Sequence, residues 1–377
     1  MKYRPLFLLN VLPFFAVATA SILGDFHPST YPKKVAKCEA LHRPDSTIKM
    51  IDIHYVDINP SASKTIIMVH GWPSLWSSWS NQILEFQDQY HLIALDQRGF
   101  GSSTHPGDVE SSGTMGDLVG DLVCVLQDAG VETAICLGHD WGSQVCYEAA
   151  RMRPDIFEGV VGAVVPYIPA AGNFTPTAAL VHLLPRLTYQ LFFEVQTPAA
   201  VDELNKDVRR TLRATLLSAD TPPPEAFLTS KDSFLHGWED VSEIDPIPFF
   251  SQEEEDYFVE QLSIQGFANT LQFYTKGNKY ASWDFSHSQG NHTIPQPALA
   301  ILPTEDPVAD WEKASQLLHS AHFLPNLKVE TMRAAHWPQL EDPRKFNGFI
   351  RDWLDVLAQA SALAPEEKHG HHIADEL

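Results

Sequence analysis

The sequence predicts an α/β protein in which a mostly parallel sheet carries helices on both faces and an inserted helical lid. Short apolar runs recur along the 377-residue chain and end at turn-forming or charged residues. Segments of helical length separate most of these runs, as in a parallel sheet that is buried on both faces. One long stretch, residues 167–293, contains no apolar strand run. These features together predict one sheet with a helical insertion.

The apolar runs are the expected strands. Residues 51–58 roughly alternate apolar and polar side chains, which is typical of a half-buried strand. The later runs are continuous and fit fully buried strands. They comprise residues 65–69, 91–95, 133–137, 159–165, 298–302 and 327–331. A helical pattern over Gln144–Met152 follows the run 133–137.

The stretch 167–293 is rich in helix-forming and aromatic residues and contains repeated prolines, so we expect a mostly helical lid. An insertion at the carboxyl edge of a parallel sheet would cover the crevice in which ligands bind. The expected division in chain order is a signal peptide, the first part of the core, the lid, the second part of the core and a polar tail: residues 1–20, 21–166, 167–293, 294–362 and 363–377.

The composition excludes several classes of protein. The hydrophobic fraction is 44% and the charged fraction is 20%, which excludes a disordered, collagen-like or coiled-coil chain. Asp and Glu outnumber Lys and Arg by 48 to 26, and the formal net charge is −22. Because such a field repels phosphate backbones and anionic lipid surfaces, we expect no nucleic-acid partner. The sequence leaves the oligomeric state open.

The four cysteines, Cys38, Cys124, Cys136 and Cys146, show no spacing that is typical of a metal site. The sequence as a whole implies no metal ion and no organic cofactor. A chain of this length can bury a core without cross-links, so mostly buried thiols are the simpler expectation. An oxidising compartment would permit disulfides, and the sequence leaves their pairing open.

The N-terminal segment has the layout of a secretory signal peptide. Two cations within Met1–Arg4 precede an apolar run that ends at Ala18-Thr19-Ala20. Because this run is short and contains a proline, we expect no stable membrane span, and an uncleaved anchor is the alternative.

Two further features agree with the secretory pathway. Asn173 and Asn291 each begin an Asn-x-Thr sequon, which is an acceptor for glycans. The segment Ala374–Leu377 reads Ala-Asp-Glu-Leu and resembles the KDEL-type retrieval signal with its first position changed. We therefore expect a glycoprotein of the endoplasmic reticulum lumen, with secretion as the alternative.

The run 133–137 leads into a strand-to-helix turn, Gly138-His139-Asp140-Trp141-Gly142. Small residues lie two positions on each side of the central residue, which is the pattern of a nucleophile elbow. Hydrolases usually carry Ser at its centre, whereas this chain has Asp140 and contains no Gly-x-Ser-x-Gly motif. A serine esterase or lipase is therefore disfavoured. An aspartate that only caps a helix is the simpler alternative.

An aspartate nucleophile selects a different electrophile from a serine. A carboxylate is ionised at neutral pH and needs no base for its attack. Displacement at a saturated carbon gives an ester that water can hydrolyse, whereas a serine would give a stable ether. Asp140 therefore points to an epoxide or a haloalkane, and a histidine is needed to activate water against the ester.

The histidine and its orienting acid should follow the last two strands, because the expected chain order is nucleophile, acid, histidine. His336 follows the last apolar run, and Asp306 follows the run before it. Glu305 and Asp310 are close competitors for the role of the acid.

The loop after residues 65–69 reads His70-Gly71-Trp72-Pro73. In this arrangement that loop gives one backbone N–H to the oxyanion hole, and the residue after the nucleophile gives the other. Trp72 and Trp141 are therefore the expected donors. The sequence does not determine whether the Trp-Pro bond is cis.

Taken in order over residues 31–357, these motifs resemble the α/β-hydrolase-fold epoxide hydrolases of the soluble type, which are related to the haloalkane dehalogenases. The matching segments are His70–Pro73, Asp96–Ser103, Gly138–Gly142 and Asp306 with His336-Trp337. The resemblance implies hydrolysis of a small apolar epoxide to a vicinal diol.

The resemblance also implies two lid tyrosines that donate a proton to the epoxide oxygen. Tyr189, in Tyr-Gln-Leu-Phe-Phe, and Tyr274, at the end of Gly266–Tyr274, match the two lid motifs of the family. A phenol is protonated at neutral pH and can act as the donor. Four aromatic residues are expected to contact an apolar substrate: Phe192, Phe193, Phe273 and Trp337.

Two alternative functions remain open. Haloalkane dehalogenases commonly carry Asn where this chain has Trp72, and fluoroacetate-type enzymes carry Arg where it has Trp141, so a dehalogenase is the second choice. The other alternative is a non-catalytic lumenal or secreted binding protein that reuses the fold. Turnover of an aryl epoxide, of a chloroalkane or of neither separates the three.

Overall fold

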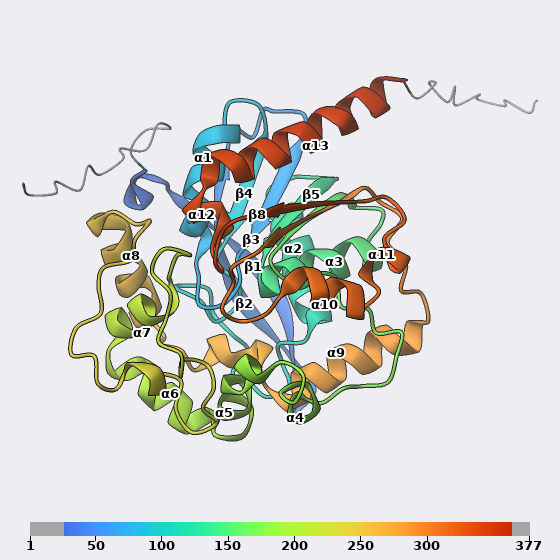
Figure 1. Ribbon diagram of the computed structural model, residues 1–377. Helices are drawn as coiled ribbons and strands as arrows, with labels where there is room; N and C mark the ends of the chain where they lie inside the picture. Colours follow the sequence, from blue (N-terminus) through green and yellow to red (C-terminus); the bar gives the residue numbers. More distant parts are fainter. Residues whose placement is uncertain (1–25, 364–377) are drawn as a thin grey trace, which may run out of the picture.

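The computed structural model describes residues 26–363, in which eight strands form a single sheet (Figure 1). In chain order the strands are β1 (Lys33–His42), β2 (Thr47–Ile58), β3 (Thr65–Val69), β4 (His91–Leu95), β5 (Ala134–His139), β6 (Phe157–Ala163), β7 (Ala298–Pro303) and β8 (Leu327–Met332). Their order across the sheet is β1-β2-β4-β3-β5-β6-β7-β8. The β1–β2 and β2–β4 pairs are antiparallel and the remaining pairs are parallel, which confirms the expected fold class.

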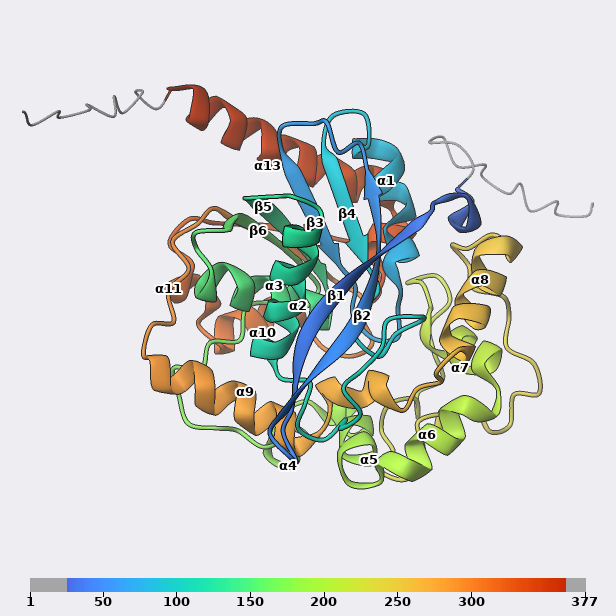
Figure 2. The ribbon, with the colours of Figure 1, turned by 180° about the vertical axis from the view of Figure 1, so that it is seen from behind.

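Strand β1 is the strand that the sequence pattern did not reveal. Each expected strand overlaps an observed one, and the bounds of β3 and β4 are those expected. The buried residues of β1 include Ala36, Cys38 and Ala40, which alternate with more exposed neighbours. Such small side chains give a weak hydrophobic signal, so the period of two is easily missed. The β1–β2 pair forms a long twisted ribbon (Figure 2).

Helices cover both faces of the sheet. On one face lie α2 (Met115–Asp128) and α3 (Trp141–Met152), which are seen in Figure 2. On the other face lie α1 (Ser80–Phe86) and α13 (Pro343–Leu363), which are seen in Figure 1. Separate apolar clusters fill the two interfaces. The short elements of the core are η1 (Pro28–Thr30), η2 (Trp76–Trp79), α10 (Trp311–Leu317), α11 (Ser320–Phe323) and α12 (Pro338–Glu341).

A helical segment between β6 and β7 gathers at one end of the sheet (Figure 1). Its elements are α4 (Thr177–Leu180), η3 (Pro185–Leu187), α5 (Tyr189–Val195), α6 (Thr197–Lys206), α7 (Val208–Thr215), η4 (His236–Trp238), α8 (Gln252–Ser263), η5 (Asn269–Phe273) and α9 (Lys276–Gln289). Buried side chains of this lid, such as Phe193 and Leu212, belong to the same apolar cluster as the sheet residue Val69. The lid therefore packs directly on the end of the sheet that carries the predicted catalytic loops.

The expectation of free buried thiols is wrong, because all four cysteines are paired. Cys38 of β1 is bonded to Cys124 of α2, with 5.8 Å between their Cα atoms. Cys136 of β5 is bonded to Cys146 of α3, with 5.4 Å between the Cα atoms. Both pairs join a strand to the helix packed on it, where Cα atoms lie within disulfide range. The first pair depends on the strand that the sequence pattern missed.

Some predictions concern residues that lie outside the described range. The expected signal peptide, residues 1–20, and the retrieval-like segment Ala374–Leu377 are among them. Over residues 26–363, the structure contains no helix with the length and apolar character needed to cross a membrane.

Candidate active site

Asp140 lies at the sharp turn between β5 and α3. Its backbone has φ 54° and ψ −123°, a region that residues other than glycine rarely adopt. The turn is tight because α3 packs closely against β3, and a Cβ on Gly142 would overlap the carbonyl oxygens of Val69 and His70. The backbone N–H of Asp140 donates to Ala163 O at 3.1 Å, which ties the turn to β6. The elbow predicted from the sequence is therefore present.

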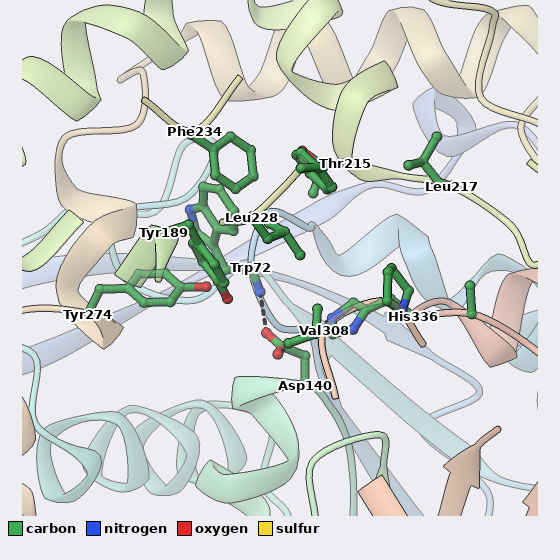
Figure 3. Close-up of a pocket in the computed structure, with 13 residues that line it drawn as sticks. Trp72, Asp140, Tyr189, Thr215, Leu217, Leu228, Phe234, Tyr274, Val308 and His336 are labelled. Carbon is green, nitrogen blue, oxygen red and sulfur yellow. Dashed lines mark hydrogen bonds and ion pairs between the residues drawn. The ribbon is translucent and has the colours of Figure 1, made fainter. Parts of the chain in front are cut away.

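The two oxygens of the Asp140 carboxylate have different surroundings (Figure 3). The backbone N–H of Trp72 donates to Oδ1 at 2.9 Å. The other oxygen, Oδ2, lies 3.5 Å from Nε2 of His336. Gly71 allows this approach, because a Cβ at that position would overlap the carboxylate. The Trp72–Pro73 bond in the same loop is cis. One oxygen is thus held by the loop after β3, and the other is left facing the histidine.

His336 is oriented by Asp306, whose carboxylate lies at the end of β7. His336 Nδ1–H donates to Asp306 Oδ2 at 2.7 Å. The Trp311 indole N–H donates to the same oxygen at 2.5 Å, and Val308 N–H donates to Oδ1 at 2.8 Å. Because the carboxylate is held by three donors, the imidazole ring has one fixed orientation with Nε2 toward Asp140.

The two competing acids have other partners. Glu305 pairs with Arg333 at 3.0 Å near the surface. Asp310 accepts a hydrogen bond from Lys313 N–H and caps α10. Of the three acids considered, the structure brings only Asp306 to His336.

Asp140 and His336 stabilise each other's charged forms. Burial lowers the pKa of His336, but the Asp306 and Asp140 carboxylates outweigh this effect and raise that pKa to about 10. Burial raises the pKa of Asp140, but the hydrogen bond and charge of His336 together with the Trp72 N–H hold it below its usual value. The resting site at neutral pH is therefore a carboxylate beside an imidazolium.

Tyr189 begins α5 and Tyr274 follows η5, and both project from the lid into the space beside Asp140 (Figure 3). Their ring centroids lie 5.9 Å apart. Burial raises the pKa of both phenols, and the negative charge of Asp140 adds to this effect. Both hydroxyls are therefore protonated at neutral pH and able to donate.

The two predicted oxyanion-hole residues contribute in different ways. The backbone N–H of Trp72 already contacts Asp140. Trp141 is the first residue of α3, where a backbone N–H has no acceptor within the helix. The Trp72 indole N–H donates to Thr270 Oγ1 at 3.0 Å, and the Trp141 indole stacks on Phe273 with 5.7 Å between ring centroids. Both indoles therefore serve to pack the lid against the core.

The predicted substrate contacts need correction. A pocket opens above Asp140 and is lined by Trp72, Asp140, Tyr189, Thr215, Leu217, Phe227, Leu228, Phe234, Tyr274, Pro307, Val308, Ala335 and His336. The four aromatics expected to touch substrate are not in this lining: Phe192, Phe193, Phe273 and Trp337. They are fully buried behind it; for example, the Phe193 ring packs against those of Trp72 and Phe234. Apart from the catalytic side chains, the wall comes from lid residues such as Leu217 and Leu228 and from core residues such as Pro307 and Val308.

Sequence reasoning missed two residues that hold the His336 loop. Glu341 accepts hydrogen bonds from the backbone N–H groups of Ala335 at 3.1 Å and Trp337 at 3.2 Å. His139 Nε2–H donates to the carbonyl oxygen of His336 at 2.7 Å, and burial lowers the pKa of His139 to about 4. A neutral His139 adds no second cation beside the imidazolium. Glu341 is identified only by spatial contact, whereas His139 stands in the elbow motif, which gave it no role of its own.

The remaining site predictions concern metals and glycans. Over residues 26–363, no three His, Cys, Asp or Glu side chains are grouped in a way that would hold a metal ion. Asn173 and Asn291 are both exposed, so each sequon is accessible from solvent.

Comparison with known proteins places this site in a family. Residues 64–343 match the family described as the alpha/beta hydrolase fold, and the chain belongs to that family. Several relatives within this family are named epoxide hydrolases. The chain is 30% identical to Epoxide hydrolase A of Mycobacterium tuberculosis over 320 residues, which cover 81% of this chain and 95% of that one. The resemblance inferred from the motifs is thereby confirmed.

Other relatives and solved structures agree. The chain is 26% identical to Bifunctional epoxide hydrolase 2 of Rattus norvegicus over 82% of its own length, and it spans about half, 54%, of that longer protein. The structure of Epoxide Hydrolase A from Mycobacterium thermoresistibile superimposes with a TM-score of 0.69 at 26% identity, covering 86% of this chain and 98% of that one. An epoxide hydrolase from an endophytic Streptomyces gives a TM-score of 0.73 at 25% identity, covering 87% and 96%.

Proposed function

We propose that this chain hydrolyses an epoxide to a vicinal diol through a covalent ester on Asp140. It is an epoxide hydrolase by its relatives, which match most of its length. One observation carries the covalent mechanism: the Asp140 carboxylate shares a pocket with two buried phenols and with His336. The pocket joins a nucleophile, two neutral acids and a base around one site for a small apolar molecule.

The first step forms the ester. Asp140 Oδ2, which no backbone group holds, attacks an epoxide carbon and forms a C–O bond while the carbon–oxygen bond of the ring breaks. The ring oxygen takes a proton from Tyr189 or Tyr274, which leaves a phenolate. Oδ1 becomes the ester carbonyl oxygen and stays on the Trp72 N–H. The products are a hydroxyalkyl ester and a phenolate beside the imidazolium.

The second step follows from the loss of charge on Asp140. Esterification removes one of the two anions that raise the pKa of His336, so its proton can pass to the phenolate. Neutral His336 then takes a proton from water as the water oxygen attacks the ester carbonyl. The oxyanion lies against Trp72 N–H, and Trp141 N–H is the second donor.

Collapse of the tetrahedral intermediate completes the cycle. The bond to the diol oxygen breaks, and that oxygen takes the proton of the newly formed carboxyl group. The carboxylate, the imidazolium and both phenols are then restored. The net change is one epoxide and one water converted to one diol.

The state of Trp72 disfavours a dehalogenase. A leaving halide is stabilised by N–H donors that point into the pocket, whereas the Trp72 indole N–H is bonded to Thr270 at 3.0 Å. The pocket presents phenols instead, and these suit an oxygen that stays attached and needs a proton. Purified protein should therefore turn over styrene oxide and leave 1-chlorobutane unchanged. If correctly folded protein turned over neither substrate, the result would favour a non-catalytic binding protein.

The location in the secretory pathway is part of the proposal. Two disulfides and two exposed sequons support an oxidising, glycosylating compartment. Protein from a eukaryotic host should begin at or near Ser21 and carry glycans on Asn173 and Asn291, as intact mass and N-terminal analysis would test. Deleting Ala374–Leu377 should move the protein into the medium. A retained Met1 with unmodified asparagines, or equal secretion with and without the tail, would contradict the respective claim.

A further inference from the structure

A chain of hydrogen-bonded polar side chains, two of them buried and two partly buried, leads through the lid to the Tyr189 hydroxyl. It comprises Gln190 and Glu194 of α5, Thr177 of α4 and Lys279 of α9, and it is called here the lysine relay. Lys279 Nζ donates to Thr177 Oγ1 at 2.8 Å and to Gln190 Oε1 at 3.3 Å, and it lies 3.4 Å from Glu194 Oε2. Gln190 Nε2 in turn donates to the Tyr189 hydroxyl oxygen at 3.4 Å. The relay therefore ends on one of the two proposed acids.

The chemistry of lysine fixes the direction of the hydrogen bonds in the lysine relay. A protonated ammonium is only a donor, whereas an amide has one acceptor end and one donor end. Burial lowers the pKa of Lys279 to about 8 against the opposing charge of Glu194, so the ammonium form predominates at neutral pH. The amide oxygen of Gln190 must then face Lys279, and its NH₂ group must face the phenol.

This direction matters for proton donation. A phenol oxygen that accepts the Gln190 N–H keeps its own hydrogen free to donate to another acceptor, such as an epoxide oxygen in the pocket. The same N–H stabilises the negative charge that develops on that oxygen as the proton leaves. The Lys279 ammonium also lies 5.9 Å from the centroid of the Tyr274 ring, so the same cation contacts the second lid tyrosine.

We propose that Lys279 is a positioning residue for epoxide opening, which acts by orienting the Gln190 amide toward Tyr189. The proposal rests on the proposed function, because it requires Tyr189 to donate the proton. Lys279 touches neither substrate nor the reacting atoms. Its influence should therefore appear in the alkylation step and not in hydrolysis of the ester, which His336 controls.

A purely structural role is the competing explanation, since the contacts of Lys279 also join α9 to α4 and α5. Such a role predicts a loss of thermal stability and similar effects on both steps. It does not predict that substitution of Lys279 would have no further effect on the alkylation rate once Gln190 has been substituted.

The experiment measures alkylation alone, in the His336→Gln background in which the ester accumulates. Lys279→Met should slow single-turnover alkylation by styrene oxide about tenfold, as for loss of one hydrogen bond with charge assistance. Lys279→Arg keeps a donor-only cation and should stay near the parent rate. Lys276→Met, on the same helix and exposed, is the matched control and should leave the rate unchanged. In the His336 wild-type background, Lys279→Met should leave the rate of ester hydrolysis unchanged.

Coupling to Gln190 separates the possible outcomes. Gln190→Met should slow alkylation to a similar degree, and the double variant with Lys279→Met should be no slower than either single one. A parent rate for Lys279→Met, or effects that multiply, would overturn the proposal. If Lys279→Met does not fold, a parent rate for Gln190→Met overturns it equally. If Tyr189→Phe alkylates at the parent rate, Tyr189 is not the proton donor, and it is this part of the proposed function that is overturned.

Discussion

The core half and the lid half of the site are built by different physical means. The three residues of the core half each follow a strand of the sheet, so the backbone of the sheet fixes the positions of their Cα atoms: Asp140, Asp306 and His336. Tyr189 and Tyr274 come from lid elements whose position depends on side-chain packing, such as the Tyr189 ring against that of Phe234. The sheet thus defines an attack on carbon, and the lid defines which leaving atom can be assisted.

The two halves also differ in charge. The core half holds two carboxylates around an imidazolium: Asp306 and Asp140 raise the pKa of His336, and His336 lowers the pKa of Asp140. The lid half is neutral, because burial raises the pKa of both phenols. Charge that is lost on one half during alkylation appears on the other. Substitutions in the core should therefore act mainly on ester hydrolysis, and substitutions in the lid mainly on ring opening.

The largest effect is expected from His336→Gln. Alkylation needs no base, but hydrolysis does, so overall turnover should fall by about a million-fold, as for loss of the histidine in other hydrolytic triads. The protein should gain the mass of one epoxide, and peptide mapping should place it within Gly138–Ser143. Asp140→Ala should gain no mass at all. A His336→Gln protein that binds a reactive epoxide without alkylation would mean that the base acts in the first step.

Asp306→Asn should have the next largest effect, about a 10,000-fold loss of turnover by analogy with the triad aspartate. It removes an anion that raises the pKa of His336, so that pKa should fall. The neutral base then persists to lower pH. The acid limb of ester hydrolysis should therefore move to lower pH while its plateau drops, as stopped-flow measurement of the ester over a pH series would show. An acid limb that moves to higher pH would contradict the expected fall in the pKa of His336.

Tyr274→Phe and Tyr189→Phe should each slow alkylation about 100- to 1,000-fold, by analogy with loss of one oxyanion-hole donor. Hydrolysis of the ester, once formed, should change much less. Rapid-quench measurement of ester formation and decay separates the two rates in one experiment. If both rates fell equally, the lid tyrosines would be acting through folding of the site and the division between the halves would not hold.

The sequence predicted the core half well because its residues are tied to strand ends. Asp140, Asp306 and His336 each follow an apolar run, and the required order leaves few candidates. The tyrosines were found only through a family resemblance, since the lid has no strand period to anchor them. Nothing in the local pattern distinguishes Tyr189 from the exposed Tyr280.

Other features depended on contacts between distant segments. Leu217 and Leu228 line the pocket because irregular lid loops fold over the sheet. A periodic sequence pattern does not predict the path of such loops. Phe193 was expected there for its aromatic character, yet it packs behind Trp72. The disulfide of Cys38 follows from a strand whose small buried residues gave little signal.

Leu217→Ala gives the smallest expected effect and tests the lid as the source of specificity. Leu217 lies between α7 and η4, is buried and lines the pocket, so its side chain should contact a bulky substituent of the epoxide but not a methyl group. The ratio of kcat/KM for styrene oxide over propylene oxide should fall about tenfold, the value of one small apolar contact in a binding pocket. Leu183→Ala, at a lid residue that is 77% exposed, is the matched control and should leave the ratio unchanged. Ester hydrolysis should stay at the wild-type rate in both variants, because the groups that activate water belong to the core. An equal loss for both epoxides would mean that Leu217 supports the folding of the lid rather than its selectivity, and the source of specificity would then have to lie on the core side, at Pro307 and Val308.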